Sequence, residues 1–241
     1  MIIVQARSTS KRFPNKSMSE IGGYPMIHWV LSGCLPNREF HKIILAIPYG
    51  SAELMLREYV SIHFPEIEII QGDENDVYSR FQTALTVYRE VFESEDIGIG
   101  LVRVCADRPL ISPQLISRLK HHDDKNFELL FNHEVYGDNG PSGIGAESLS
   151  KPLAKELFSG KRRDWIEREH VTARLYELEP HLCKSDDIWR SIEFQNSFNY
   201  SVDSPIDLEV INSIVDEFSI LPGDEIPVTL FMEFESFLCR N

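Results

Sequence analysis

The feature that most constrains the fold is a regular alternation of short apolar runs with longer amphipathic stretches. The runs are rich in Ile, Val and Leu, which is typical of buried strands. Strands separated by helices in this way form a mostly parallel sheet that helices cover. We therefore predict an α/β fold, a Rossmann-like three-layer sandwich. The expected strands are 2–6, 42–47, 66–70, 97–104, 127–131 and 191–194.

The amphipathic stretches predict the helices. The clearest example covers 76–92, where apolar residues recur at helical spacing and Asp76 stands at the N-cap position. Pro25 suits the first turn of a helix that begins near residue 24. The other expected helices are 24–34, 51–62, 113–121, 150–158, 164–177, 204–217 and, in an ambiguous tail, 224–239.

The alternation breaks after residue 131. The stretch NHEVYGDNGPSGIGAES, with several glycines and one proline, is typical of a loop. We predict one domain over 1–241, since 241 residues suffice for a single full core. Its α/β core would comprise 1–131 and 188–218, with an inserted subdomain at 132–187 and a C-terminal tail at 219–241. Such an insertion suits substrate specificity or dimer contacts.

Charge is distributed unevenly. The chain has 38 Asp and Glu against 24 Lys and Arg, a formal net charge of -14, which argues against nucleic acid as a partner. Residues 7–16 nevertheless hold Arg7, Lys11, Arg12 and Lys16 and no acid, directly behind the first expected strand. Ligands of open α/β sheets bind beyond the carboxyl ends of strands. These cations suit a polyphosphate, and a solvated turn is the simpler alternative.

Two aspartates complete a pattern of chemical interest. Asp107 directly follows the expected strand 97–104, and Asp203 precedes the helix that begins near Pro205. Either could cap a helix or turn, and either could be a hard oxygen ligand for Mg²⁺. A basic loop with two carboxylates suits nucleotidyl transfer, because that chemistry depends on positioning and charge neutralisation rather than on a covalent nucleophile.

Other motifs are missing from the sequence. The four cysteines are far apart, which leaves zinc and redox motifs unsupported and favours a reducing compartment. None of the eight histidines shows metal-ligand spacing. No apolar stretch approaches ~18 residues, and no signal-peptide pattern opens the chain. We expect a cytoplasmic protein with no membrane partner.

The order of these segments resembles the cytidylyltransferase family that activates sugars. The opening IIVQARSTSKRFPNKSMSEIGGYPMIHWV is similar to the pattern I-x-Q-A-R-x-x-S-x-R-x-P-x-K followed by I-x-G-x-P-x-I. The similarity is greatest to the SpsF-type branch, related to CMP-KDO and CMP-N-acylneuraminate synthetases, and covers about 1–217. The later matching blocks, in order, are GDENDVYSRFQTA, LVRVCADRPLISPQLI, GIGAESLSKPLAKE, EREHVT and YSVDSPIDLEVI.

The resemblance implies a nucleotide-diphospho-sugar transferase type of fold and a Mg²⁺-dependent reaction. CTP and a sugar or sugar acid would give a CMP-sugar and pyrophosphate for surface polysaccharide synthesis, and a CDP-linked product from a phosphorylated acceptor stays open. A homodimer is also implied.

The same resemblance assigns roles to residues. It implies that Asp107 and Asp203 hold the metal and that Lys16, Arg12 and Asp107 are catalytic. The implied nucleotide-binding residues are Gln5, Ala6, Arg7, Arg12, Lys16, Asp76, Arg80 and Asp107. The implied substrate-binding residues are Gly143, Gly145, Glu147, Arg168, Glu169 and His170, of which the last three could instead contact the dimer mate.

The chain departs from the family pattern in places. Thr9 and Asn15 stand where the family loop has glycine, Ala106 replaces another glycine, and Arg108 adds a charge beside Asp107. Two alternatives therefore stay open. A glycosyltransferase of related fold would want a D-x-D pair, and a non-catalytic nucleotide- or sugar-binding relative would need no turnover.

Some implied residues also have simpler interpretations. Arg80 could pair with Asp76 at i,i+4, and Glu169 and His170 could form a solvated helix face.

Overall fold

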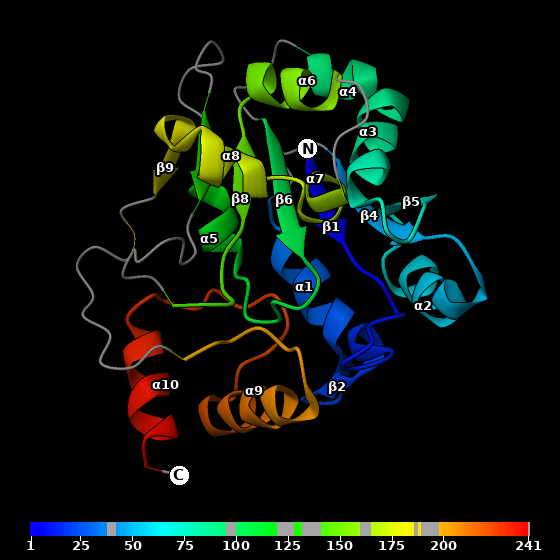
Figure 1. The fold of residues 1–241 in the computed structure, drawn as a ribbon. Helices are drawn as coiled ribbons and strands as arrows, with labels where there is room; N and C mark the ends of the chain where they lie inside the picture. Colours follow the sequence, from blue (N-terminus) through cyan, green and yellow to red (C-terminus); the bar gives the residue numbers. More distant parts are fainter. Residues whose placement is uncertain are drawn as a thin grey trace.

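A computed structural model describes residues 1–37, 42–94, 100–119, 128–131, 141–159, 165–185, 188 and 198–240. These residues form a central sheet with helices on both faces (Figure 1). The three-layer α/β sandwich expected from the sequence is thereby confirmed. Within the described ranges, no helix is long and apolar enough to cross a membrane.

The central sheet has the strand order β5-β4-β1-β6-β8-β7-β9. In one half, all neighbours are parallel: β5 (Glu68–Gly72), β4 (Ile43–Pro48), β1 (Ile2–Gln5) and β6 (Leu101–Cys105). In the other half, β8 (Glu147–Leu149) is antiparallel to β6 and β7 (Leu129–Phe131), and β9 (Cys183–Ser185) is parallel to β7. Because β1 and β6 are parallel neighbours, their following loops meet at one edge.

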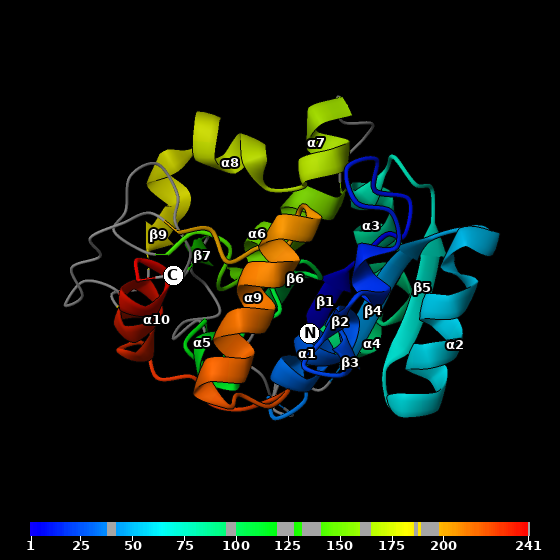
Figure 2. The same cartoon turned by 90° about the horizontal axis from the view of Figure 1, so that it is seen from below.

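Side chains of β1 alternate between two hydrophobic clusters. Ile2 and Val4 contribute to one cluster and Ile3 to the other, so both faces of the strand are covered and its residues are apolar in succession. Figures 1 and 2 show the helices on the two sides of the sheet. The first cluster includes residues of α1 (Met26–Cys34), α2 (Leu54–His63), α5 (Pro113–Ser117), α9 (Pro205–Phe218) and α10 (Leu230–Leu238). The second includes residues of α3 (Val77–Val87), α4 (Arg89–Glu93), α6 (Lys151–Ser159) and α8 (Ala173–Leu178).

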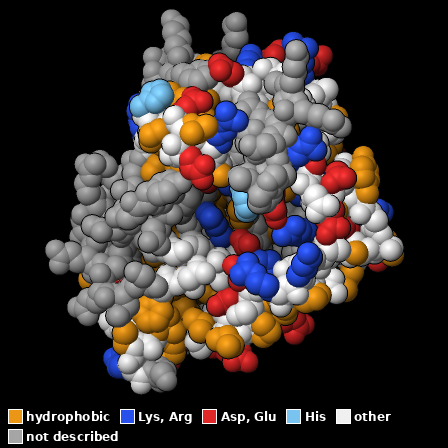
Figure 3. Space-filling model, in the orientation of Figure 1, with side chains coloured by type: hydrophobic (Ala, Val, Ile, Leu, Met, Phe, Trp, Pro, Cys, Tyr) orange, Lys and Arg blue, Asp and Glu red, His pale blue; other side chains and the backbone are white. Residues whose placement is uncertain are grey.

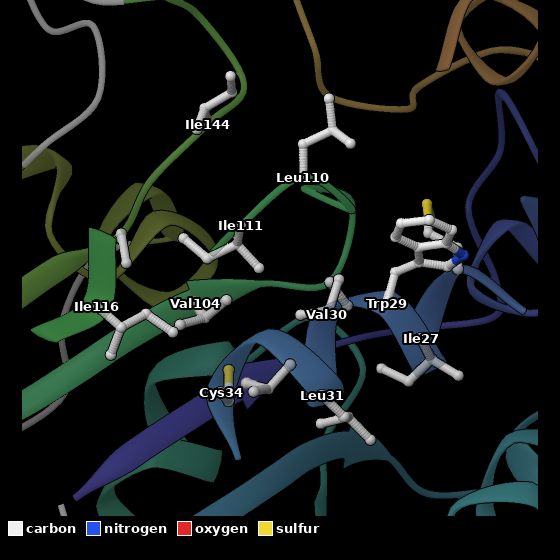
Figure 4. Close-up of a cluster of buried hydrophobic side chains, with 14 of the residues drawn as sticks. Ile27, Trp29, Val30, Leu31, Cys34, Val104, Leu110, Ile111, Ile116 and Ile144 are labelled. Carbon is white, nitrogen blue, oxygen red and sulfur yellow. The ribbon is translucent and has the colours of Figure 1, made fainter. Parts of the chain in front are cut away.

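Helix α1 packs closely against β6 and the segment before α5. Figure 4 shows its Val30 and Cys34 among Val104 of β6 and Ile111, all of them buried. A Cβ added to Gly33 would lie 2.3 Å from the main-chain oxygen of Ile111, so glycine allows this close approach. Each buried Val or Ile side chain contributes about 1.5–3 kcal/mol to stability. This packing fixes the segment that follows β6.

Two helices begin at residues whose side chains cap the helix N-terminus. Asp76 caps α3 by accepting a hydrogen bond of 2.8 Å from Ser79 N, as the sequence predicts. At α9 the cap is Ser204, which forms a capping box with Asp207 ahead of Pro205. Asp203 is therefore not the cap of this helix, and its carboxylate is available for other contacts.

Several expected helices differ in extent. The stretch 76–92 divides into α3 and α4 around Tyr88, and 164–177 divides into α7 (Trp165–His170) and α8. The second break falls at Val171, whose φ is 42°. In the C-terminal tail the helix covers only α10, and the helix expected at 113–121 is the shorter α5.

Several short strands were not predicted from the sequence. The hairpin of β2 (Glu20–Ile21) and β3 (Tyr24–Pro25), and the strands β8 and β9, were not expected. Each has only two or three residues, too few for a visible alternation. Both β8 and β9 fall within 132–187 yet join the central sheet, and the division into core and inserted subdomain stays a prediction. The strand expected at 191–194 lies outside the described residues.

Candidate active site

A cleft of about 610 Å³ opens where β1 and β6 end. Figure 3 shows side chains of Lys and Arg and of Asp and Glu gathered around a hollow on this face. The cleft brings together residues that are far apart in the sequence. Its lining includes Gln5, Ala6, Arg7, Thr9, Ser10, Lys11, Arg12, Lys16, Ser17, Glu74, Asn75, Val77, Arg80, Arg103, Cys105, Ala106, Asp107, Glu169, His170 and Asp203.

The basic loop after β1 is held from outside by Glu53. This carboxylate is fully buried, with 0% exposure, and accepts hydrogen bonds of 2.8 Å from both Ser8 N and Ser8 Oγ. Asn15 N closes the loop by donating to Ser8 O at 2.8 Å. Thr9 Oγ1 donates to Glu74 Oε1 at 2.5 Å and so ties the loop to the segment before α3. The loop is therefore fixed before any ligand enters.

Asn15, which stands where the family pattern has glycine, has a backbone conformation that suits glycine. Asn15 has φ 57° and ψ 21°, a left-handed conformation. Glycine adopts it freely, and asparagine tolerates it better than most residues do. Because Lys16 follows directly, this turn sets the direction from which the lysine enters the cleft.

Lys16 lies at the centre of the site. Its Nζ donates to Asp107 Oδ2 at 3.1 Å, to Asp203 Oδ1 at 3.0 Å and to the main-chain oxygen of Val202 at 2.9 Å. The Lys16 side chain is only 11% exposed. Arg12 adds a second ion pair to Asp203 Oδ1 at 3.1 Å. The two aspartates that the sequence singled out thus converge on one point.

The electrostatics of this cluster favour the ionised form of Asp203. Burial of Asp203 works to raise the pKa of its carboxyl, but hydrogen bonds and charges from Lys16 and Arg12 outweigh it. The net result holds the Asp203 pKa below its ordinary value of 3.8.

Asp107 and Asp203 fit a magnesium ion by the chemistry of their donors. Carboxylate oxygens from two loops reach a common cation position, and the main-chain oxygen of Val202 faces the same point. Within the described ranges, no group of three or more His, Cys, Asp or Glu side chains forms a complete metal cage. Mg²⁺ commonly binds through one or two carboxylates and takes its remaining ligands from substrate phosphates and water.

Helix α7 forms the opposite wall. Arg7 Nη2 donates to Glu169 Oε1 at 3.5 Å, and both Glu169 and the exposed His170 line the cleft. Arg168 contacts Asp76 Oδ2 at 3.6 Å. Val171, directly after the helix, is buried at φ 42°, a conformation that costs a β-branched residue about 1–3 kcal/mol. The packing that imposes this bend also holds the end of α7 over the cleft.

Arg80 is buried at the cleft wall, with 2% exposure. Its Nη1 donates to the main-chain oxygens of Asp73 at 2.6 Å and Glu74 at 3.3 Å. These hydrogen bonds differ from the i,i+4 ion pair with Asp76 that the sequence suggested. Burial and the charge of Arg7 lower the Arg80 pKa to about 10. Its Nε has no hydrogen-bond partner. Arg80 therefore holds the 73–76 segment and keeps one buried donor unused.

Three predicted substrate residues lie elsewhere. Glu147 is buried, and its Oε2 accepts from Arg103 Nη1 at 3.0 Å and from Thr172 Oγ1 at 2.7 Å. Gly143 packs on the 199–201 backbone, and Gly145 O accepts from Arg108 Nη1 at 2.9 Å. None of the three is part of the cleft lining given above, and neither are Arg168, a fourth predicted substrate residue, and Asp76, a predicted nucleotide residue. The structure does not bring them to the cleft.

Several residues of the site were not predicted from the sequence. Arg103 lines the cleft and donates through Nε to Gln5 Oε1 at 3.0 Å. Glu53, Glu74 and Ser8 fix the basic loop. The block containing Glu74 was noted, but nothing in the sequence distinguishes Glu53 from other acids that precede a helix.

The fold and the cleft together define a class of protein. A basic loop after the first strand and two carboxylates around one cation, on a mostly parallel three-layer sandwich, are features of a nucleotidyltransferase. The sequence model of the cytidylyltransferase family matches residues 1–211. The chain belongs to this family, which decides against the glycosyltransferase alternative.

Two curated relatives illustrate the similarity of the sequence to known proteins. An uncharacterized protein of Methanocaldococcus jannaschii is 28% identical over 76% of this chain and 68% of its own length. A 3-deoxy-manno-octulosonate cytidylyltransferase of Haemophilus ducreyi is 24% identical over 52% of this chain. The aligned region spans only 46% of that enzyme.

Solved structures show the same fold. A cytidylyltransferase from Leptospira borgpetersenii has a TM-score of 0.79 at 20% identity, over 99% of this chain and 94% of its own. A CMP:2-keto-3-deoxy-manno-octonic acid synthetase complexed with CTP has a TM-score of 0.59 at 14% identity, over 90% of this chain and 98% of its own. The nucleotide-diphospho-sugar transferase type of fold is confirmed.

Proposed function

We propose that the protein transfers the CMP group of CTP to a hydroxyl of a sugar or sugar acid in a Mg²⁺-dependent reaction. The products are a CMP-sugar and pyrophosphate. The observation that carries the proposal is the convergence of Lys16, Asp107 and Asp203 beneath the basic loop. Family membership and a relative named as a 3-deoxy-manno-octulosonate cytidylyltransferase support CTP and a sugar acid as substrates.

The basic loop would hold the triphosphate. Arg7 and Arg12 are partly exposed, with side-chain exposures of 41% and 73%, so they can turn to phosphate oxygens. Arginine binds phosphate through two parallel hydrogen bonds, and lysine meets it as a point charge. Because Glu53 already fixes the loop through Ser8, little ordering cost remains when the nucleotide binds.

Asp107 and Asp203 would hold the metal that neutralises charge on the α-phosphate during the reaction. The acceptor hydroxyl then loses its proton to solvent while its oxygen forms a bond to the α-phosphorus. The bond from that phosphorus to the oxygen that bridges to the β-phosphate breaks, and pyrophosphate leaves with the electron pair. Lys16 and the arginines of the loop would stabilise the negative charge that develops on the leaving pyrophosphate. The residues of this chain thus contribute positioning and charge rather than a covalent nucleophile.

The far wall would receive the acceptor. Glu169 and His170 line the cleft opposite the basic loop and offer hydrogen-bonding groups to sugar hydroxyls. A role in surface polysaccharide synthesis, a cytoplasmic location and a homodimer belong to this proposal as well. Glu147 would then support the site from behind through Arg103, and Gly145 through Arg108. Gly143 would contribute through its packing on the 199–201 backbone.

The test is release of pyrophosphate by the full chain with CTP, Mg²⁺ and a panel of sugars and sugar acids. We expect release with CTP and not with ATP, GTP or UTP, and only when a matching acceptor is present. Asp107→Asn should abolish it, whereas Glu217→Gln, on the exposed face of α9, should not. A folded protein that binds no CTP and releases nothing across the panel contradicts the proposal.

A further inference from the structure

All three donors of the Lys16 ammonium group are occupied. A lysine ammonium has three N–H bonds, and here they point to Asp107, Asp203 and the main-chain oxygen of Val202 at 2.9–3.1 Å. No donor is left for a phosphate oxygen. In this arrangement Lys16 neutralises the site instead of binding a nucleotide.

The position of the ammonium group is also the position that suits the metal. Asp107 Oδ2 and Asp203 Oδ1 both contact Lys16 Nζ, and the same two carboxylates are the proposed Mg²⁺ ligands. Two cations cannot share this point, because like charges a few ångströms apart in a partly buried site repel one another strongly. Binding of metal and retention of Lys16 between the carboxylates therefore exclude one another.

The main chain that carries the two carboxylates is held independently of Lys16. Val202 N donates to Asp107 O at 2.8 Å, which joins the two loops. Asp203 N donates to Asp207 Oδ2 at 2.9 Å, which anchors the Asp203 main chain to the capping box of α9. Release of the lysine would thus leave both backbone positions unchanged, and Arg12 still contacts the Asp203 carboxylate. Lysine has a flexible four-carbon stem, so a rotation of the side chain is enough.

We propose that Lys16 is a placeholder cation, which occupies the metal position in the nucleotide-free protein and moves to a phosphate when the metal–nucleotide complex enters. The assignment of the vacated position to Mg²⁺ rests on the proposed function. The consequence is coupling between the ligands: free metal competes with Lys16 and binds weakly, whereas a triphosphate gives the displaced ammonium group a new partner.

The experiment measures Mn²⁺ binding to the nucleotide-free full chain by the loss of the free-ion electron paramagnetic resonance signal. Lys16→Met removes the competing charge and should tighten Mn²⁺ binding by about tenfold or more relative to wild type. Lys11→Met is the matched control, because Lys11 is an exposed cation of the same loop. It reports the general effect of removing one positive charge and should change the affinity by less than about threefold.

Two further variants keep the result interpretable. Lys16→Gln retains hydrogen-bonding capacity without charge and should also tighten Mn²⁺ binding, so it replaces Lys16→Met if circular dichroism shows that variant unfolded. Adding Asp107→Asn to Lys16→Gln should remove the gain, because one of the two carboxylates is lost. Unchanged or weaker Mn²⁺ binding in a folded Lys16 variant overturns the placeholder role.

The outcome is separable from that of the proposed function. Suppose that the Lys16 variants bind Mn²⁺ more tightly, but the wild-type protein releases no pyrophosphate from CTP with any acceptor. This result would support the exchange of Lys16 for metal and contradict the cytidylyl transfer. Pyrophosphate release by wild type, together with unchanged Mn²⁺ binding in Lys16→Gln, would support the transfer and contradict the exchange.

Discussion

Glu53 accepts two hydrogen bonds from Ser8, one from the amide nitrogen and one from the hydroxyl group, each 2.8 Å long. The two residues are 45 positions apart, and Glu53 is fully buried. A carboxylate outside the cleft thereby fixes the basic loop, which carries cations of the cleft.

We expect Glu53→Ala to weaken both stability and CTP binding. The buried amide of Ser8 would lose its partner, at a cost of about 1–3 kcal/mol measured by urea unfolding. The KM for CTP should rise more than kcat falls, because the loop loses its order before the nucleotide binds. Ser8→Ala, which removes only the hydroxyl bond, should have a smaller effect on both. Unchanged CTP kinetics in folded Glu53→Ala would contradict this role.

Asn15 should be replaceable by glycine and not by a β-branched residue. Its φ of 57° suits glycine, so the free energy of unfolding of Asn15→Gly should be within about 0.5 kcal/mol of the wild-type value. Asn15→Val should cost about 1–2 kcal/mol or more, because a branched Cβ is disfavoured in the left-handed region. Thermal and urea unfolding of the two variants give the comparison. Equal stability of the two would show that this backbone conformation is not required.

Two glycines with similar positive φ angles allow backbone strain to be distinguished from a steric clash of an added Cβ. Gly143 has φ 75° and Gly23 has φ 82°, but a Cβ on Gly143 would lie 2.1 Å from Ser201 N, whereas one on Gly23 meets nothing within 4 Å. Gly23→Ala should therefore cost only about 1 kcal/mol of conformational strain. Gly143→Ala should cost clearly more in the same urea unfolding experiment. The reverse order would mean that the 141–146 segment does not pack on the 199–201 segment.

The ion pair of Arg103 and Glu147 should behave as a structural unit. The two side chains are 10% and 6% exposed, and Arg103 Nη1 lies 3.0 Å from Glu147 Oε2. Glu147→Leu should destabilise the protein by about 3–5 kcal/mol, since it leaves a buried charge uncompensated. The double variant Arg103→Met and Glu147→Leu should recover part of that loss. A double variant no more stable than Glu147→Leu would contradict this assignment.

Stability should depend on pH through Asp203. Its folded pKa lies below the ordinary value of 3.8, so the carboxylate stabilises the fold above that value and the contribution is lost as the pH falls through the folded pKa. Urea unfolding between about pH 5 and pH 2 should show a shallower acid slope for Asp203→Asn than for wild type. Identical slopes would show that the contact with Lys16 does not favour the ionised form.

The sequence allowed the centre of the site to be predicted for a physical reason. Lys16 is separated from Asp107 by 91 positions and from Asp203 by 187. The first two nevertheless follow strands that a mostly parallel sheet brings to one edge. Asp203 was singled out at an expected helix start, and the family resemblance implied its role as a metal ligand. Charge and strand ends are local properties, and they are visible without a structure.

The supporting contacts could not be predicted in this way. Glu53 acts through a hydrogen-bonding partner 45 positions away, and no local pattern marks it. Glu147 belongs to β8, whose three residues pair with β6 and β7 through long-range contacts. Its placement beneath Arg103, away from the cleft, depends on that register.

The central claim is that this site breaks the bond between the α- and β-phosphates of CTP and joins the α-phosphate to a sugar hydroxyl. The most direct measurement follows CTP labelled at the α-phosphate, and separately at the γ-phosphate, in the presence of Mg²⁺ and an active acceptor. We expect the α-label in the sugar product and the γ-label in pyrophosphate, with neither transfer in Asp107→Asn. Release of the γ-label as inorganic phosphate, or an α-label that never reaches the acceptor, would contradict the account.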